Sequence, residues 1–256
     1  MRGTRPLKRW RYVGVFCEEL MACAASIQVG IARQAFWAVY LREESMLRER
    51  TRTLRRSGAV ELARGRVRVH DAGVELDLEL EEDAGWEARC RDPGGGEVWT
   101  RKQAGVAARG TLGVDGAPAR SVNARAVIDD TAGYHARRTE WRWSAGVGHA
   151  PDGSPLAWNL VSGINDPRSG SERAVWIDGA AHEVAPVSFS GDLERIECED
   201  GSALRFRAEA RRSRKENLLL VRSDYSAPFG SFAGTLPGGV ELEHGLGVVE
   251  HHRAVW

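Results

Sequence analysis

Apolar and polar residues alternate with a period of two over much of the chain. The clearest run is Val74–Glu81, in which four apolar residues alternate with acidic residues. Arg66–His70 and Ala203–Arg211 follow the same pattern. Because successive side chains of a β-strand point to opposite faces, these segments are predicted to be antiparallel strands, each with one face in a core and one face in water.

Asp-Gly pairs separate many of the strand-like runs, at positions 115–116, 152–153, 178–179 and 200–201. The central residues of a tight hairpin turn adopt positive φ, which Asp and Gly tolerate. Connections are short throughout, so neighbouring strands are expected to pair as a meander. The prediction is an all-β protein made of many antiparallel strands.

Two packed β-barrel-like halves are expected, with a boundary near Arg101–Gly105. The first half would comprise residues 1–105, and the second, residues 106–256, would carry all the Asp-Gly turns and the reactive segment that begins at Ile128. The charged segment Glu43–Arg56 leaves two interpretations open, a helix or a charged hairpin. At most one or two short helices are therefore expected.

Composition excludes several classes of function. The 36 basic residues balance the 36 acidic residues of this 256-residue chain, and no basic stripe suggests nucleic acid as a partner. No apolar run is long enough for a signal-peptide core or stable membrane insertion, so a soluble cytoplasmic protein is expected. The four cysteines lack CxxC spacing and are expected to be buried free thiols.

Motifs for cofactors and metals are missing as well. The sequence contains no GxGxxG, no phosphate-binding loop, no GxSxG and no HExxH. Glu250-His251-His252 looks like a metal motif, but adjacent strand residues point to opposite faces, so the two histidines cannot easily share an ion. No cofactor and no metal site are predicted.

The segment Ile128–Gly146 holds the densest chemistry in the chain. Asp129 and Asp130 are expected in a turn that follows a strand ending at Ile128. They either cap that turn through their own side chains, or one of them is an acid whose pKa is raised by neighbouring indoles. Tyr134 and His135 are candidates to relay or orient a proton.

A strand after this turn would place Arg137, Trp141 and Trp143 on one face, and pairing with the next strand would bring Trp158 beside them. These indoles either fill a core or line an apolar pocket at a barrel mouth. In the second interpretation Arg137 and Asn159 would supply polar contacts to a ligand.

Several segments together resemble a bacterial family, domain of unknown function 2804. The segments are Arg5–Phe16, Arg33–Val39, Ile128–Gly148, Ala157–Asp166, Ser171–Gly179, Phe229–Gly238 and Gly245–Trp256. The family implies no activity. More distantly the chain is similar to tandem lipocalin-like proteins that include carotenoid hydratases, which implies two lipocalin-like halves. Longer family members carry a segment before Arg5, so the first strand of the first half is expected either to be missing or to start downstream of the natural start.

Three hypotheses for function follow. The first is a lipocalin-like binding module for an apolar small molecule, a lipid or an isoprenoid. The second is a hydratase or isomerase in which Asp129 or Asp130 protonates a carbon–carbon double bond, with cation–π stabilisation by the indoles. The third is a structural or protein-interaction domain. The sequence does not determine the ligand or the oligomeric state.

Overall fold

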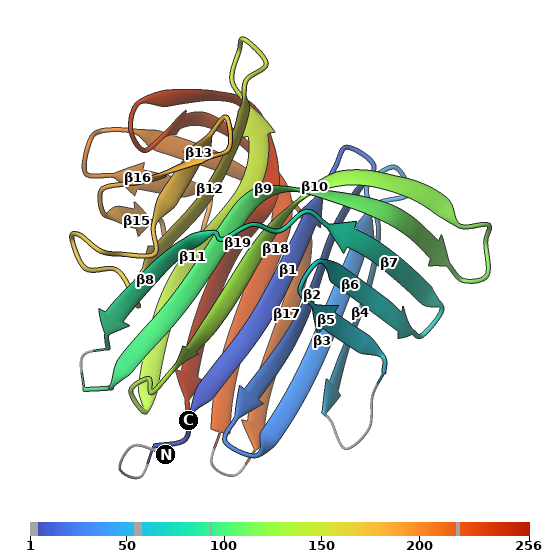
Figure 1. Ribbon diagram of the computed structural model, residues 1–256, viewed down its shortest axis with the longest axis horizontal. Helices are drawn as coiled ribbons and strands as arrows, with labels where there is room; N and C mark the ends of the chain where they lie inside the picture. Colours follow the sequence, from blue (N-terminus) through green and yellow to red (C-terminus); the bar gives the residue numbers. More distant parts are fainter. Residues whose placement is uncertain (1–4, 54–57, 93, 219–220) are drawn as a thin grey trace.

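The protein is built of two curled antiparallel sheets (Figure 1). The computed structural model describes residues 5–53, 58–92, 94–218 and 221–256. These residues contain strands and no helix, so this part of the chain has no helical segment that could cross a membrane. The all-β class is therefore confirmed.

The N-terminal sheet is formed by ten strands, in the order β4-β3-β2-β1-β10-β9-β7-β6-β5 with β8 paired to β9. Their bounds are β1 (Lys8–Phe16), β2 (Leu20–Val29), β3 (Ala32–Leu41), β4 (Met46–Thr53), β5 (Val60–Ala63), β6 (Arg66–Asp71), β7 (Val74–Leu80), β8 (Trp86–Arg91), β9 (Glu97–Val114) and β10 (Arg120–Gly133).

The C-terminal sheet is formed by nine strands, in the order β14-β13-β12-β11-β19-β18-β17-β16-β15. Their bounds are β11 (Arg138–His149), β12 (Pro155–Ser162), β13 (Ala174–Ile177), β14 (Ala180–Glu183), β15 (Val187–Phe189), β16 (Arg195–Cys198), β17 (Ala203–Leu218), β18 (Val221–Leu236) and β19 (Val240–Val255).

The two sheets share one topology. In each sheet the first strand pairs with the last, β1 with β10 and β11 with β19, and the two edge strands are consecutive in sequence. Position by position, β1 therefore corresponds to β11 and β10 to β19. The predicted pair of packed β-barrel-like halves is confirmed, and the halves repeat the same strand order.

Several local predictions are confirmed. The run from Val74 forms β7, in which every second residue is buried. Asp115-Gly116 has φ of 51° and 77°, and Asp178-Gly179 has φ of 49° and 82°, as tight hairpin turns require. All four cysteines are free; Cys17 is half-buried and the other three are buried.

The helical interpretation of the segment from Glu43 is wrong. Met46–Thr53 is a strand that pairs with β3 along its whole length, and residues 54–56 lie outside the described residues. Pairing with β3 overrides the helix propensity of its Arg and Glu residues, whose side chains are mostly exposed on this edge strand.

The predicted boundary at residues 105 and 106 falls inside β9. The N-terminal sheet ends at Gly133 and the C-terminal sheet begins at Arg138, so the sheets separate in residues 134–137. β9 remains one strand because β8 pairs with its first part and β7 with its last part.

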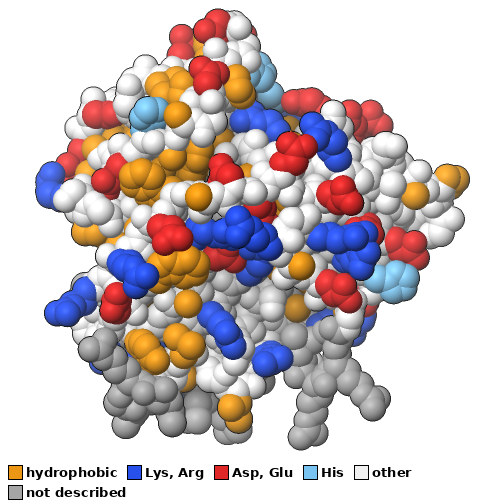
Figure 2. Space-filling view, viewed as in Figure 1, with side chains coloured by type: hydrophobic (Ala, Val, Ile, Leu, Met, Phe, Trp, Pro, Cys, Tyr) orange, Lys and Arg blue, Asp and Glu red, His pale blue; other side chains and the backbone are white. Residues whose placement is uncertain are grey.

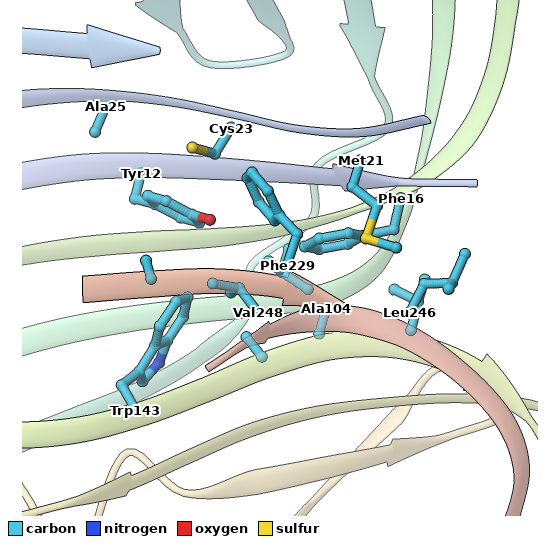
Figure 3. Close-up of a cluster of buried hydrophobic side chains, with 14 of the residues drawn as sticks. Tyr12, Phe16, Met21, Cys23, Ala25, Ala104, Trp143, Phe229, Leu246 and Val248 are labelled. Atoms are coloured by element: carbon cyan, nitrogen blue, oxygen red, sulfur yellow. The ribbon is translucent and has the colours of Figure 1, made fainter. Parts of the chain in front are cut away.

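The central strands are buried on both faces, and each face belongs to a different core. In β1, Val13 and Val15 face a core enclosed by the N-terminal sheet, whereas Tyr12 and Phe16 face a core between the two sheets. Figure 3 shows this second core, in which Tyr12 and Phe16 approach Phe229 and other side chains of the C-terminal sheet. Double burial explains why such strands are nearly continuous apolar runs.

A third core lies inside the C-terminal sheet, and Trp158 is its largest fully buried side chain. The indole packs edge-on against Phe232, with ring centroids 4.9 Å apart. A Cβ atom at Gly146 would lie 2.4 Å from the indole, so the absence of a side chain at this position lets β11 pass closely over it.

We expect Trp158→Ala to lower the free energy of unfolding by about 3–5 kcal/mol, because it removes a fully buried indole and leaves a cavity. Urea denaturation followed by circular dichroism measures the change. Trp99→Ala is the matched control, since Trp99 is half-buried on β9. A loss at Trp158 no larger than the loss at Trp99 would contradict the assigned core position.

Candidate functional site

A cavity of about 360 Å³ lies between the two sheets. Its volume falls in the range of about 300–1,000 Å³ that is typical of small-molecule pockets. Strands of both sheets supply its apolar and aromatic lining, which consists mainly of Trp10, Tyr12, Ile27, Phe36, Trp141, Trp143, Val161, Ile164, Tyr225 and Trp256. The pocket is thus not at a barrel mouth, because the faces that line it are the ones through which the two halves pack.

Each sheet brings one hydrogen-bonded pair of an indole and a carboxylate to the cavity. In the N-terminal sheet, Trp10 Nε1 donates a hydrogen bond to Asp129 Oδ2 at 3.0 Å. In the C-terminal sheet, Trp141 Nε1 donates to Glu250 Oε1 at 2.7 Å. The two indole rings are nearly parallel, with an interplanar angle of 4° and centroids 6.4 Å apart. The cavity therefore has two walls of the same construction.

Strand register places the two carboxylates at equivalent positions. Asp129 on β10 lies opposite Tyr12, two residues after Trp10. Glu250 on β19 lies opposite Trp143, two residues after Trp141. The rings of Tyr12 and Trp143 meet edge to face across the gap between the sheets, with centroids 5.4 Å apart. The equivalence of β1 with β11 and β10 with β19 therefore extends to single side chains.

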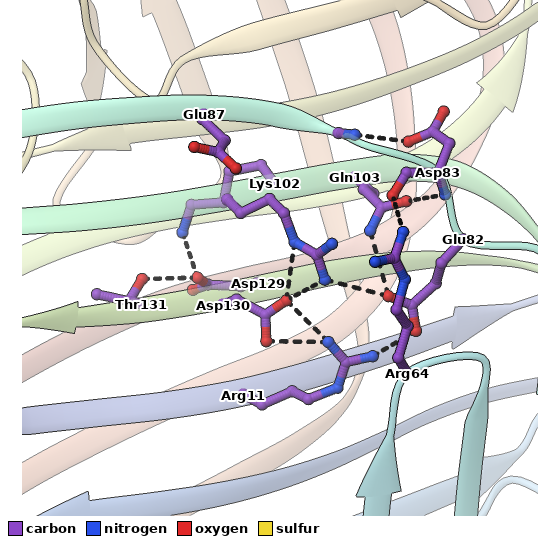
Figure 4. A network of polar contacts seen from close by, with 12 residues as sticks. Arg11, Arg64, Glu82, Asp83, Glu87, Lys102, Gln103, Asp129, Asp130 and Thr131 are labelled. Atoms are coloured by element: carbon purple, nitrogen blue, oxygen red, sulfur yellow. Dashed lines mark hydrogen bonds and ion pairs between the residues drawn. The ribbon is translucent and has the colours of Figure 1, made fainter.

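Asp129 has a buried cation beside it. Lys102 Nζ lies 2.5 Å from Asp129 Oδ1 and 3.3 Å from Glu172 Oε1. Burial lowers the pKa of Lys102, but the two carboxylates outweigh it and raise the pKa above its ordinary value. Burial raises the pKa of Glu172, and the charge of Asp129 adds to that increase. Thr131 Oγ1 completes the set by donating to Asp129 Oδ1 at 2.8 Å (Figure 4).

Glu250 has no such cation: among the described residues no Lys or Arg lies within ion-pair distance of its carboxyl group. Burial raises the pKa of Glu250 to about 7, against the hydrogen bonds from Trp141 and Tyr225, which lower it. The charge of Asp129 raises this pKa further. Glu250 is therefore a carboxyl group that holds its proton up to neutral pH.

Arg212 supplies a buried positive charge farther along the wall. Its guanidinium lies 4.1 Å from the ring centroid of Phe36 and 5.1 Å from that of Tyr225. Nη2 donates to Thr51 Oγ1 at 2.7 Å, which joins the two sheets. These contacts hold the charge over aromatic faces at the edge of the cavity.

His252 lines the cavity on the same face of β19 as Glu250. Burial lowers its pKa to about 3, so the imidazole is neutral near pH 7. Its Nε2 lies 2.7 Å from Ser223 Oγ, and its ring centroid lies 4.4 Å from that of Trp141. His251 points away and contacts Glu140 Oε1 at 2.9 Å. Within the described ranges, no group of three His, Cys, Asp or Glu side chains could hold a metal ion.

The predicted turn at Asp129 and Asp130 is wrong, because both residues lie within β10. Strand alternation sends Asp129 into the cavity and Asp130 to the opposite face. There Arg11 Nη1 contacts both Asp130 oxygens at 2.9 and 2.8 Å, and Arg101 Nη2 contacts Oδ2 at 2.7 Å. Figure 4 shows that Glu82 joins the same network. Asp130 does not line the cavity.

The three predicted indoles do not share one face. Trp158 lies opposite Gly146, so it points into the core of the C-terminal sheet, where its Nε1 donates to Ser144 Oγ at 3.0 Å. Asn159 is on the other face, and its Oδ1 accepts a hydrogen bond of 2.8 Å from Trp143 Nε1. Asn159 thus holds the Trp143 indole in place through this hydrogen bond and does not itself line the cavity.

Three further predicted site residues lie outside the cavity. His135 is buried behind Trp10, with ring centroids 5.1 Å apart, and burial lowers its pKa to about 3. Tyr134 is half-buried in the connection between β10 and β11, and Arg137 is exposed. His135 supports the indole, whereas Tyr134 and Arg137 do not reach the cavity.

Sequence patterns do not single out Lys102, Glu172 or Arg212 of the cavity, and they present Glu250 only as part of a metal-like Glu-His-His motif. One signal points to Glu250. Trp10-Arg-Tyr12 and Trp141-Arg-Trp143 share the pattern Trp-Arg-aromatic, and Ile128-Asp129 corresponds to Val249-Glu250. The other three come to the cavity through strand pairing and loop placement, which leave no local signature.

Residues 96–256 match the sequence profile of the family described as Domain of unknown function (DUF2804). A comparison with curated protein sequences gives no match.

Solved structures with the same fold include an AttH-like protein from Nitrosomonas europaea, with 12% identity and a TM-score of 0.62 over 98% of this chain and 93% of that chain. Kievitone hydratase from Nectria haematococca has 11% identity and a TM-score of 0.61, over 95% and 88%. CghA in complex with Sch210972 has 11% identity and a TM-score of 0.53, over 98% and 88%.

At these identities the likeness shows the fold alone, and both halves of the chain have the lipocalin-like architecture that was expected. The family profile covers the last strands of the N-terminal sheet and the whole C-terminal sheet, which together carry Lys102, Asp129, Trp141 and Glu250. The match extends over more than half of the sequence, and the chain belongs to the DUF2804 family.

Proposed function

We propose that the protein binds an apolar small molecule, of the lipid or isoprenoid class, in the cavity between the sheets. The observation that carries this proposal is a cavity between the sheets whose surface is mainly aromatic and aliphatic. Ligand pockets are typically apolar, with a small number of placed polar groups that orient the ligand. Trp10, Trp141 and Trp143 would wall the ligand, and Asp129 and Glu250 would contact its polar end. A purely structural role gives no reason for such a cavity.

Titration with a panel of lipids and isoprenoids is expected to change the tryptophan fluorescence, because four indoles line the cavity: Trp10, Trp141, Trp143 and Trp256. Trp141→Ala should weaken binding by about 10- to 100-fold, since it removes about 1.5–3 kcal/mol of apolar contact. Trp99→Ala, outside the cavity, should leave the affinity unchanged. A panel in which no apolar ligand changes the fluorescence would argue against the proposal.

A second candidate function is a hydratase or isomerase that acts on a carbon–carbon double bond. The specific observation in its favour is Glu250, whose pKa of about 7 lies in the range where a carboxyl group serves as a general acid. On the opposite wall Asp129 and Lys102 form an ion pair. The fold likeness to kievitone hydratase is an analogy that agrees with this candidate.

In this reaction the Glu250 carboxyl group would give its proton to one carbon of the double bond. The positive charge left on the other carbon would face the indoles of Trp141 and Trp143, where cation–π attraction contributes about 2 kcal/mol when water is excluded. Addition of water to this carbon, followed by loss of a proton to Asp129 or back to Glu250, gives the hydrated product. Loss of a neighbouring proton to Asp129 or to Glu250 instead gives an isomer. Where Asp129 takes the proton, Asp129 releases it to solvent and Glu250 regains one from solvent before the next turnover.

Glu250→Gln is expected to lower turnover of an alkene substrate by about 10²-fold or more while ligand binding persists, because the amide has no acidic proton. In the unaltered protein kcat/KM should fall tenfold per pH unit above about 7, as Glu250 loses its proton. Asp129→Asn should also slow turnover, and Asp130→Asn, outside the cavity, is the control. If turnover survives Glu250→Gln, the proposed acid is wrong.

Protonation of Glu250 is also expected to affect stability. Its pKa of about 7 in the native state lies above the 4.5 of an exposed glutamate, so between these values the native state binds the extra proton. The contribution of this proton to the free energy of unfolding is therefore fully present below pH 4.5, and it is lost as the pH rises from 4.5 to about 7.

Glu250→Gln removes this dependence. Relative to the unaltered protein, the variant should gain about 3 kcal/mol in free energy of unfolding as the pH rises through this window. Urea denaturation at a series of pH values measures the difference. A constant difference between the two proteins would contradict the raised pKa.

A further inference from the structure

Two large hydrophobic side chains are exposed among the described residues, and both lie at one place. Ile31, in the turn between β2 and β3, is 101% exposed, and Leu7, just before β1, is 36% exposed. The Gly30 amide donates to the Leu7 carbonyl oxygen at 2.9 Å, which holds the two segments together. In Figure 1 this turn and the N-terminal segment lie at the lower end of the molecule. We call Leu7 and Ile31 the apolar tip.

The apolar tip lies at the mouth of the cavity. Val29 and Ala32, on either side of the turn, belong to the cavity lining. The exposed residues of that lining are Ala32, Arg33, Thr53 and Arg214, which come from the β2–β3 turn, the end of β4 and the last part of β17. The cavity therefore opens to solvent beside Ile31.

The surface around the apolar tip is basic, although the chain as a whole has equal numbers of basic and acidic residues. Arg9 and Arg33 are exposed next to the tip, and neither forms an ion pair within the described part of the chain. Arg9 Nε instead donates to Gln28 Oε1 at 3.0 Å. On the face of the molecule shown in Figure 2, Lys and Arg side chains lie among acidic and hydrophobic ones.

We propose that this end of the molecule docks on an anionic lipid surface, with the cavity mouth facing the bilayer. An apolar side chain flanked by guanidinium groups fits the boundary of such a surface. The apolar side chain enters the acyl region of the bilayer, and the guanidinium groups pair with the lipid phosphates. A second copy of this chain fits less well, because Arg9 and Arg33 of two copies would face each other.

The proposed function gives this docking its use. An apolar ligand would pass directly between the bilayer and the cavity without crossing water, and the aromatic lining begins behind Val29 and Ala32. This ligand transfer rests on the proposed function. The docking itself does not, because the exposed tip and the unpaired arginines are independent of what the cavity holds.

Sedimentation of the full chain with lipid vesicles tests the proposal. The protein is expected to bind vesicles of phosphatidylcholine mixed with phosphatidylglycerol, to bind pure phosphatidylcholine far less, and to dissociate as salt is added. Arg33→Glu should weaken binding about fivefold or more, from the loss of one basic residue near the surface. Ile31→Asp should weaken it about tenfold or more, from the loss of one buried apolar side chain.

Arg205→Glu is the matched control, because it makes the same charge change at an exposed position of β17. It lies nine residues before Arg214 on that strand, or about 31 Å from the mouth. Its vesicle binding should equal that of the unaltered protein. The proposal is overturned if the protein stays in the supernatant with anionic vesicles, or if Arg205→Glu loses as much binding as Arg33→Glu.

Two further measurements separate the alternatives. If analytical ultracentrifugation shows a dimer that Ile31→Asp dissociates, and vesicles are not bound, the apolar tip is an interface between copies and the proposal is wrong. Fluorescence titration with a soluble apolar ligand, without vesicles, should give the same affinity for Ile31→Asp and the unaltered protein. Vesicle binding without any ligand binding would remove the proposed function and leave the docking intact.

Discussion

Burial of both faces of the central strands is the constraint on which the rest of the structure depends. Successive side chains of β1, β10, β11 and β19 alternate between a core inside one sheet and the core between the sheets. A shift of one residue in register would exchange these two sets, so the packing of each half and the wall of the cavity are determined together. The cavity is therefore a property of the interface between the halves and not of either half alone.

Because the two sheets share one topology, the two cavity walls have an indole and a carboxylate at equivalent strand positions. The walls differ in the charges that lie near these carboxylates. A buried carboxylate needs a nearby cation or a proton, because desolvation of the charged form is costly. Lys102 on β9 supplies the cation for Asp129. Glu250 has no cation at ion-pair distance among the described residues, and it responds by holding a proton, with a pKa of about 7. An acid and an ion-paired carboxylate thus face one apolar space, which is an arrangement suited to proton transfer.

The same geometry connects the interior of the protein with its surface. The cavity lies between the sheets and opens at the end where the β2–β3 turn presents Ile31 and Arg33. One path from the surface to the interior therefore connects the apolar tip and its neighbouring arginines with the aromatic lining and the polar groups of the cavity. Unrelated functions share such folds, so the likeness to proteins with 11–12% identity carries the fold alone.

The sequence by itself determined the strands, the Asp-Gly turns and two of the pocket indoles, because hydrophobic period and turn chemistry are local properties. It also pointed to Asp129, through the density of reactive residues around it. Tertiary structure alone decided that Asp130 and Trp158 face away from the cavity, and that Lys102 and Glu250 join it. Those outcomes depend on register, both across the β9–β10 hairpin and between strands far apart in sequence such as β11 and β19, and on the charge that pairing places beside each carboxylate.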